Sequence, residues 1–480
     1  MKKTLREWLR PILFLGQNPI TLIGAVLTTS SAITIIGFWL FELVHRGPVP
    51  PYAGIVIFLV LPGIFVLGLL LMPLGGLWRR YRLVREGKLP HVYPSFDLRR
   101  PILQRALLWI AGMTFVNVAI MGTASYKAVE HMDSVQFCGQ TCHSVMAPEY
   151  TAYSNSAHSR VACVDCHIGS GAPWFVRAKI SGVRQLFAVN LKTYSRPIPS
   201  PVRNLRPARD TCERCHWPEK FTGDKLLIKT KYGDDAANTA ATSVLLMKIG
   251  GHSAQGHVGI HGRHLDLASR IEYVSTDGRR QVIPRVTYVD DSGKKVEYVS
   301  DEVKTTPQQL AAAEHRTMDC MDCHNRPAHT FQLPERAVDE ALTSGAISKD
   351  LPFVKKESVA LLRAEYPDRG TASQKITQEF VDFYKAKYPD VYQNKRAAVE
   401  SASQQVKAVY LRNIFPEMKV RWGSYPNNLG HDDFMGCFRC HDGKHKASDG
   451  RVIADDCSAC HQVLAMEEKD PKVLADLGMK

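Results

Sequence analysis

The chain has 480 residues, with 61 lysines and arginines against 47 aspartates and glutamates, which gives a formal net charge of +14. This charge is uneven, because residues 1–126 carry 13 basic and 4 acidic side chains whereas the remainder carries 48 and 43. The basic excess therefore belongs mainly to an apolar N-terminal part. No basic groove with interleaved aromatic residues is visible, which argues against a nucleic-acid-binding protein.

Three uncharged segments predict three transmembrane helices. Residues 11–41, 47–78 and 106–126 contain no charged side chain, and about 20 apolar residues are enough to cross the core of a bilayer. We expect helices near 19–44, 53–77 and 106–126. A buried helix of a soluble protein is the alternative, which the length of the first two segments disfavours. The first segment is too long for a removable signal peptide and predicts a signal anchor.

The loops between these segments predict their orientation. The N-terminus is basic, and residues 79–105 carry eight lysines and arginines, whereas residues 42–52 carry only one. Since positive charge is enriched on the cytoplasmic side, we expect the N-terminus and the 79–105 loop to be cytoplasmic. The chain after residue 126 then lies in the periplasm of a bacterial inner membrane.

The remainder of the chain has strand and helix patterns in separate stretches. Alternating apolar and polar residues, with turns at 276–278 and 291–293, predict an antiparallel meander with strands at 271–274, 282–289 and 296–299. Helical apolar spacing predicts a spacer with helices at 335–342, 356–365, 373–387 and 395–411. The charged tail after Ala465 is expected to form a surface helix.

Six Cys-Cys-His groups use all twelve cysteines of the chain. Two thiols of such a group can add to the vinyl groups of haem, and the adjacent histidine can bind the iron. Zinc ribbons and disulfides are the alternatives, but neither explains a histidine directly after every second cysteine. The first group has one additional residue between its cysteines. The groups are Cys138–Cys142–His143, Cys163–Cys166–His167, Cys212–Cys215–His216, Cys320–Cys323–His324, Cys437–Cys440–His441 and Cys457–Cys460–His461.

The sequence therefore predicts six covalently bound haem c groups. Such haem is attached outside the cytoplasm, which agrees with the periplasmic location predicted for the chain after residue 126. The expected fold is a mainly α membrane protein, with three transmembrane helices and a haem-packed cytochrome c domain that contains a small antiparallel β insertion. The expected parts are a membrane anchor (1–126), haems 1–3 (127–230), a His-rich segment with the meander (231–310), haem 4 (311–335), the helical spacer (336–430) and haems 5–6 with the tail (431–480).

Ten histidines of the soluble part lie outside the motifs and are candidates for the distal iron positions. Those close to a motif are expected to be ligands, namely His158, His315, His329, His431 and His445. The Gly- and His-rich stretch 250–264 is expected to add one or two, with His261 and His264 favoured. His131 and His252 are expected to be structural. Ligation by two histidines leaves no open position for a substrate and suits electron transfer.

Met146, three residues after His143, is a candidate ligand for the first haem. A methionine ligand would raise the potential of that haem. The alternatives are that Met146 only packs in the core and that the sixth position of the iron stays open.

The stretch 127–335 resembles the NapC/NirT/NrfH family of membrane-anchored multihaem quinol dehydrogenases. The resemblance implies that Met146 ligates haem 1. His158, nine residues before His167, would ligate the haem of His216, and His329, five residues after His324, would ligate the haem of His167. Lys179, twelve residues after His167, matches a lysine at the quinol site of the family.

The chain also departs from that family. An acidic residue that the family places beyond the lysine has no clear counterpart near Gln185 and Leu186. Three expected transmembrane helices stand where the family usually has one, and two further motifs follow the fourth. These features resemble the larger inner-membrane cytochromes of metal-reducing bacteria.

The resemblance implies that menaquinol is oxidised at the periplasmic face of the membrane, in a cleft beside haem 1. Electrons would reach a periplasmic cytochrome or reductase in anaerobic respiration. Lys179 would bind a quinol oxygen, and Glu149 or Asp133 would accept protons. The alternative is that Lys179 is only a surface charge or a partner for a haem propionate. Two rival functions are a terminal reductase with an open iron, and a non-catalytic conduit and anchor within an oligomer or larger respiratory complex.

Overall fold

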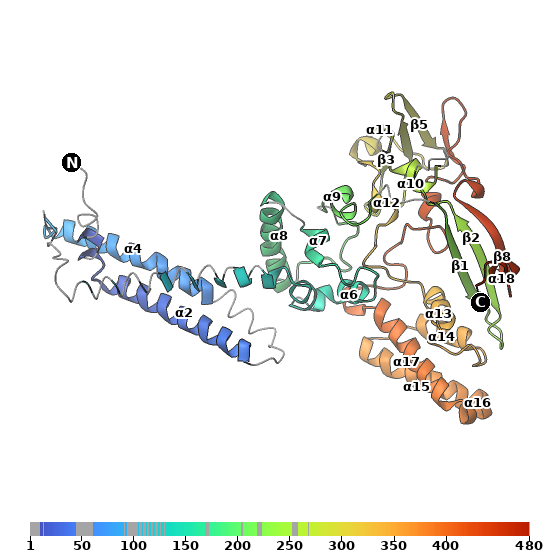
Figure 1. Ribbon diagram of the computed structural model, residues 1–480, viewed down its shortest axis with the longest axis horizontal. Helices are drawn as coiled ribbons and strands as arrows, with labels where there is room; N and C mark the ends of the chain where they lie inside the picture. The colour runs from blue at the N-terminus through green and yellow to red at the C-terminus, as the bar shows by residue number, and fades with distance from the viewer. Residues whose placement is uncertain are drawn as a thin grey trace. The chain divides into compact units, whose positions relative to one another are not determined.

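The computed structural model divides the chain into two compact units, residues 1–141 and 142–480, which are described separately (Figure 1). It describes residues 10–12, 14–44, 61–90, 92–93, 130–141, 143–168, 172–202, 205–217, 223–251, 258–266 and 268–479, together with scattered residues between 104 and 128.

The first unit contains two helices that are long and apolar enough to cross a membrane, α2 (Pro19–Val44) and α4 (Leu61–Arg85). Helix α2 has the predicted bounds. Helix α4 covers the described part of the second predicted span and continues through four arginines, ending at Arg85. The predicted third span, 106–126, lies largely outside the described residues.

Small residues bring α2 and α4 into close contact. A Cβ atom on Gly24 of α2 would lie 2.7 Å from the carbonyl oxygen of Gly68 on α4. The Thr21 hydroxyl of α2 donates a hydrogen bond to the Met72 carbonyl of α4, 3.1 Å away. Small residues and hydroxyls are the groups that let apolar helices approach within a membrane.

The second unit contains a helical layer with its own apolar core. Its helices are α13 (Pro334–Thr343), α14 (Val354–Arg363), α15 (Arg369–Lys387), α16 (Pro389–Asn394) and α17 (Arg396–Asn413). The side chains of Ile376, Phe380 and Tyr384 on α15 are fully buried in this core. The Asp368 side chain caps the start of α15 by accepting a hydrogen bond from the Thr371 N–H. The four predicted helices are confirmed, and the short α16 was not predicted.

A five-stranded antiparallel sheet, in the order β6-β3-β4-β5-β7, contains the predicted meander. The meander is β3 (Arg270–Ser275), β4 (Arg285–Val289) and β5 (Lys295–Ser300), and it is confirmed. Strands β6 (Glu314–Thr317) and β7 (His445–Ala447) extend it at its two edges. They come from segments on either side of the helical layer, and the sequence pattern did not reveal them.

A second sheet, in the order β1-β2-β8, joins the middle of the chain to its C-terminal part. Strands β1 (Lys225–Tyr232) and β2 (Ala240–Met247) form a hairpin, and β8 (His461–Glu468) pairs with β2. The predicted surface helix after Ala465 is wrong over its first residues, because they continue β8. Only Lys472–Asp476 forms a helix, α18.

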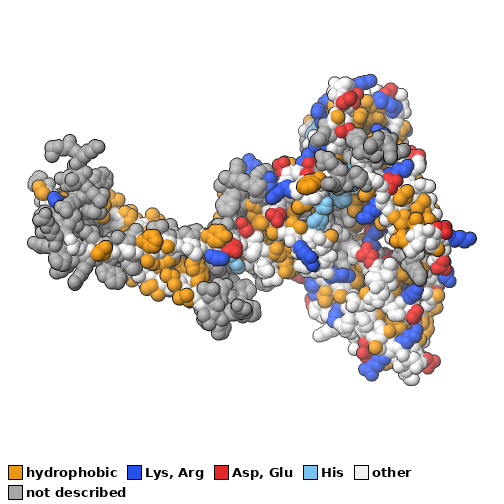
Figure 2. Space-filling model, in the orientation of Figure 1, with side chains coloured by type: hydrophobic (Ala, Val, Ile, Leu, Met, Phe, Trp, Pro, Cys, Tyr) orange, Lys and Arg blue, Asp and Glu red, His pale blue; other side chains and the backbone are white. Residues whose placement is uncertain are grey.

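The motif segments form short helical turns. They include α7 (Cys163–His167), α9 (Ala208–Cys212), α12 (Cys320–Cys323), η5 (Gly436–Arg439) and η6 (Cys457–Ala459). Figure 2 shows histidine side chains at the surface of this unit, among charged residues of both signs.

Candidate haem sites

Five motif histidines each face one histidine from outside the motifs. The ring centres lie 6.2 Å apart for His167 and His329, 6.0 Å for His216 and His158, 6.4 Å for His324 and His261, 5.9 Å for His441 and His264, and 6.3 Å for His461 and His431. Every pair therefore combines one histidine that follows a cysteine with one that does not.

The separation of these rings fits a metal ion held between them. A metal–imidazole bond is about 2 Å long and the ring centre lies about 1 Å behind the nitrogen, so two imidazoles on one ion have centres roughly 6 Å apart. A stacked or hydrogen-bonded pair of rings would be closer. The side chains present therefore fit a haem iron with two histidine ligands, next to the thiols that would attach the haem.

Hydrogen bonds orient five of these rings, because the Nδ1 atom of each faces a backbone carbonyl. A carbonyl can only accept, so Nδ1 carries the hydrogen and Nε2 keeps the lone pair that a metal requires. The pairs are His158 with Pro327 (3.3 Å), His261 with Ile249 (2.5 Å), His264 with Ile260 (2.8 Å), His329 with Glu149 (3.0 Å) and His441 with Ala454 (2.5 Å).

Helix α10 (Ile260–His264) carries two of the rings that face motif histidines. His261 and His264 are three residues apart, so they lie on one side of the helix. Burial lowers the pKa of His264, and burial also lowers the pKa of His329. Both rings are therefore neutral at physiological pH, and the neutral ring is the form that binds a metal.

Two histidines that the sequence placed among the ligands make different contacts. The Nε2 atom of His315, on β6, faces the Leu310 carbonyl at 3.2 Å. The buried ring of His445, on β7, has Nδ1 2.9 Å from an Asp442 oxygen and Nε2 2.8 Å from the Ile283 carbonyl. In both rings, Nε2 is used for a hydrogen bond to a carbonyl and is not directed at a motif histidine.

Three further histidines of the soluble part lie outside the motifs and outside the five pairs. His131 packs edge-on against Phe137, with ring centres 5.6 Å apart. His252 and His257 lie outside the described residues.

The first motif has a distinct backbone. Residues Phe137–Thr141 form a π-helical turn, η2, which accommodates the additional residue of this motif. Met146 lies half-buried on α6 (His143–Ser154). Cys142 and the His143 side chain lie outside the described residues, as does the side chain of Lys179 on α8 (Ala172–Asn190).

A buried ion pair that the sequence did not reveal supports the ring of His329. The Arg326 guanidinium lies 2.8 Å from the Glu149 carboxylate, and these side chains are only 6% and 13% exposed. Arg326 Nε also donates to the His329 carbonyl at 2.6 Å. Glu149 is therefore engaged by a buried cation, which disfavours its predicted role as a proton acceptor. The two residues are far apart in sequence, so no local pattern could have paired them.

Comparisons with known proteins show which proteins the chain is similar to. Residues 100–197 match the model of the NapC/NirT cytochrome c family, N-terminal region. The chain is 41% identical over 453 residues to the cytochrome c-type protein ImcH of Geobacter sulfurreducens, which covers 94% of this chain and 88% of that protein. It is 28% identical over 93 residues to the cytochrome c-type protein NrfH of Wolinella succinogenes, covering 19% and 52%. No solved structure matches the chain.

The extent of the first match and the family model agree with the resemblance noted from the sequence. Membership implies covalently bound haem c, and the two apolar helices of the first unit agree with a location in the inner membrane. The chain belongs to the NapC/NirT cytochrome c family of membrane electron-transport proteins.

Proposed function

We propose that the protein is a menaquinol dehydrogenase that oxidises quinol at the periplasmic face of the inner membrane. The observation that carries the proposal is the set of five facing histidine pairs, each beside two thiols. Bound haem c would supply a one-electron carrier at each of the six motifs, and electrons would leave to a periplasmic cytochrome or reductase.

The proposed ligand set follows the geometry of the rings. His167 pairs with His329, His216 with His158, His324 with His261, His441 with His264, and His461 with His431. His315 and His445 are omitted, because their Nε2 atoms are used in hydrogen bonds. Met146 remains the proposed partner of His143 at the first motif.

Two histidines per iron favour a carrier of electrons over a terminal reductase. A reductase needs an iron position that is open to substrate, whereas the five facing pairs would occupy both axial positions. Only the first motif could then keep an open position. This is the motif next to the membrane segments in sequence, where a quinol rather than a small oxyanion is expected.

Lys179 is proposed to donate a hydrogen bond to a quinol oxygen. Quinol oxidation releases two electrons and two protons, and the protons would leave to the periplasm. The proposal rests on the match of Lys179 to the family pattern, twelve residues after His167.

The test is anaerobic mixing of the purified protein with a reduced menaquinol analogue while the haem absorption bands are followed. Wild type should be reduced rapidly. We expect Lys179→Ala to slow the reduction at least tenfold, because a lost charged hydrogen bond costs about 1.5–3 kcal/mol. The control, Arg184→Ala, removes an exposed charge from the same helix α8 and should leave the rate within about twofold of wild type.

The rival function, a non-catalytic conduit and anchor within a larger respiratory complex, makes the opposite prediction. If dithionite reduces every haem but menaquinol reduces none in wild type, the chain does not oxidise quinol by itself. It would then receive its electrons from another subunit of a larger complex.

A further inference from the structure

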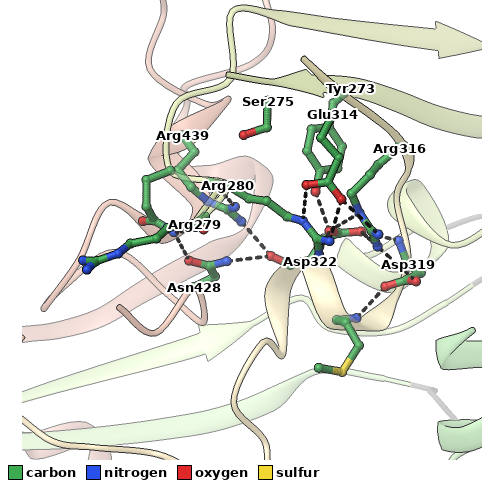
Figure 3. Close-up of polar contacts among 12 residues, drawn as sticks. Tyr273, Ser275, Arg279, Arg280, Glu314, Arg316, Asp319, Asp322, Asn428 and Arg439 are labelled. Atoms are coloured by element: carbon green, nitrogen blue, oxygen red, sulfur yellow. Dashed lines mark hydrogen bonds and ion pairs between the residues drawn. The ribbon is translucent and has the colours of Figure 1, made fainter. Parts of the chain in front are cut away.

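The fourth and fifth motifs are joined through a buried polar cluster (Figure 3). Asp322 precedes the second cysteine of the fourth motif, and it is 2% exposed. Its carboxylate accepts hydrogen bonds from the Tyr273 hydroxyl (2.5 Å), from Arg316 Nε (3.2 Å) and from the Asp319 N–H (2.7 Å). A second guanidinium, that of Arg280, lies 3.8 Å away. The charge of Asp322 is thus matched within the cluster.

Arg439 occupies the corresponding position of the fifth motif, directly before Cys440, and it is 8% exposed. Its guanidinium donates to three backbone carbonyls, those of Gly436 (2.8 Å), Arg280 (2.7 Å) and Asp322 (2.7 Å). In the described part of the chain, no carboxylate lies within ion-pair distance of it. Arg439 is therefore a buried cation that is held by dipoles alone, in contact with the backbone of the fourth motif.

Helix α10 joins the same two motifs a second time. His261 faces His324 of the fourth motif, and His264 faces His441 of the fifth. The two metal sites are thus fixed relative to each other from both sides: their distal rings share one helical turn, and their motif turns share the bonds of Arg439.

We propose that Arg439 positions the fourth and fifth haem sites as a rigid pair and that its buried positive charge raises the reduction potentials of both. This inference rests on the ligand pairs of the proposed function. A reduced iron carries one positive charge fewer than an oxidised iron, so a nearby cation favours the reduced form, and burial keeps water from screening the interaction. Its three carbonyl bonds hold the guanidinium between the two sites.

Two substitutions of Arg439 separate its charge from its geometry. Arg439→Gln keeps a hydrogen-bond donor but removes the charge, whereas Arg439→Lys keeps the charge but cannot reach three carbonyls. The measurement is an equilibrium redox titration of the full-length holoprotein with chemical mediators, followed by haem absorption and by electron paramagnetic resonance. We expect Arg439→Gln to lower the potentials of two of the six haems and Arg439→Lys to retain them. Arg279→Gln, which removes an exposed arginine next to Arg280, should shift none.

Equal shifts in the Gln and Lys variants, or no shift in the Gln variant, would overturn the proposal and leave Arg439 as a purely structural tie. If Arg439→Gln is recovered without its full haem content, Arg280→Gln takes its place. That variant removes a cation from the same cluster but leaves the backbone carbonyl that Arg439 binds, so it should lower the same two potentials, and the absence of that shift would refute the role of the cluster charge.

These titrations use no quinol, so they are independent of the quinol assay. A wild type that menaquinol cannot reduce would refute the proposed function and leave the potentials of the Arg439 variants interpretable. Conversely, normal quinol oxidation with unshifted potentials would refute only the role of Arg439.

Discussion

The proposed ligand histidines differ from the other candidates in the partner of each ring nitrogen. In His158, His261 and His264, Nδ1 donates to a carbonyl and the ring lies opposite a motif histidine. In His315 and His445, Nε2 itself is used by a carbonyl. Nearness to a motif in sequence carries no information about this difference, which explains why His158, His315 and His445 were equivalent candidates before their surroundings were known.

Removal of His264 should open one iron. His264→Ala is expected to convert one of the six haems from low-spin to high-spin, because the iron bound by His441 would lose its second ligand. Electron paramagnetic resonance of the oxidised protein measures this change. His315→Ala is the matched control and should leave the spectrum unchanged, and a new high-spin signal in that variant would contradict the proposed ligand set.

The buried Arg326–Glu149 pair should matter for stability. Glu149→Gln leaves a guanidinium that is only 6% exposed without its counter-charge, and removing one partner of a buried pair costs about 3–5 kcal/mol. Arg363→Gln disrupts an ion pair whose side chains are 63% and 39% exposed, and it should cost at most about 1 kcal/mol. Denaturant unfolding of the two variants, followed by circular dichroism, compares these losses, and equal losses would refute the argument.

At the level of secondary structure, the periodicity of apolar residues predicted most of the helices and the meander. Helices α13, α14, α15 and α17 and the meander β3–β4–β5 lie close to their predicted positions, because each has an apolar face that repeats within a single segment. Strands β6, β7 and β8 were not predicted. They are short or continue a motif, and each is stabilised by pairing with a strand far away in sequence. The hairpin of β1 and β2 was not predicted either, although its two strands are neighbours in the sequence.

The contact between α2 and α4 depends on small residues. A Cβ atom on Gly68 would meet the backbone and hydroxyl of Thr28, whereas one on Gly63, also on α4, would meet nothing within 4 Å. We expect Gly68→Val to separate the helices and to lower the thermal stability of the protein in detergent by several degrees, while Gly63→Val leaves it nearly unchanged. Equal melting temperatures for the two variants would show that this contact is not important for stability.

Across the whole chain, the proposed ligand pairs connect segments that are distant in sequence. His158 precedes the second motif but faces the third, and His431 precedes the fifth but faces the sixth. The number of haem motifs and the number of candidate ligand histidines could be predicted from the sequence. The proposed partners of His167 and His216 came from the family resemblance. Those of His324, His441 and His461 required the tertiary structure, because each proposed partner comes from a segment that no local pattern relates to the motif.

Helix α10 also has a genetic consequence. Gly262 lies between the two proposed ligand histidines of this helix, and a Cβ atom there would lie 2.8 Å from Val258 Cγ1 and 3.0 Å from the backbone of Gly251. A side chain at this position would require the turn, Val258 or Gly251 to shift, and a shift of the turn would move both rings. A single missense allele at Gly262 would therefore impair two haem centres at once, although it alters no ligand and no cysteine.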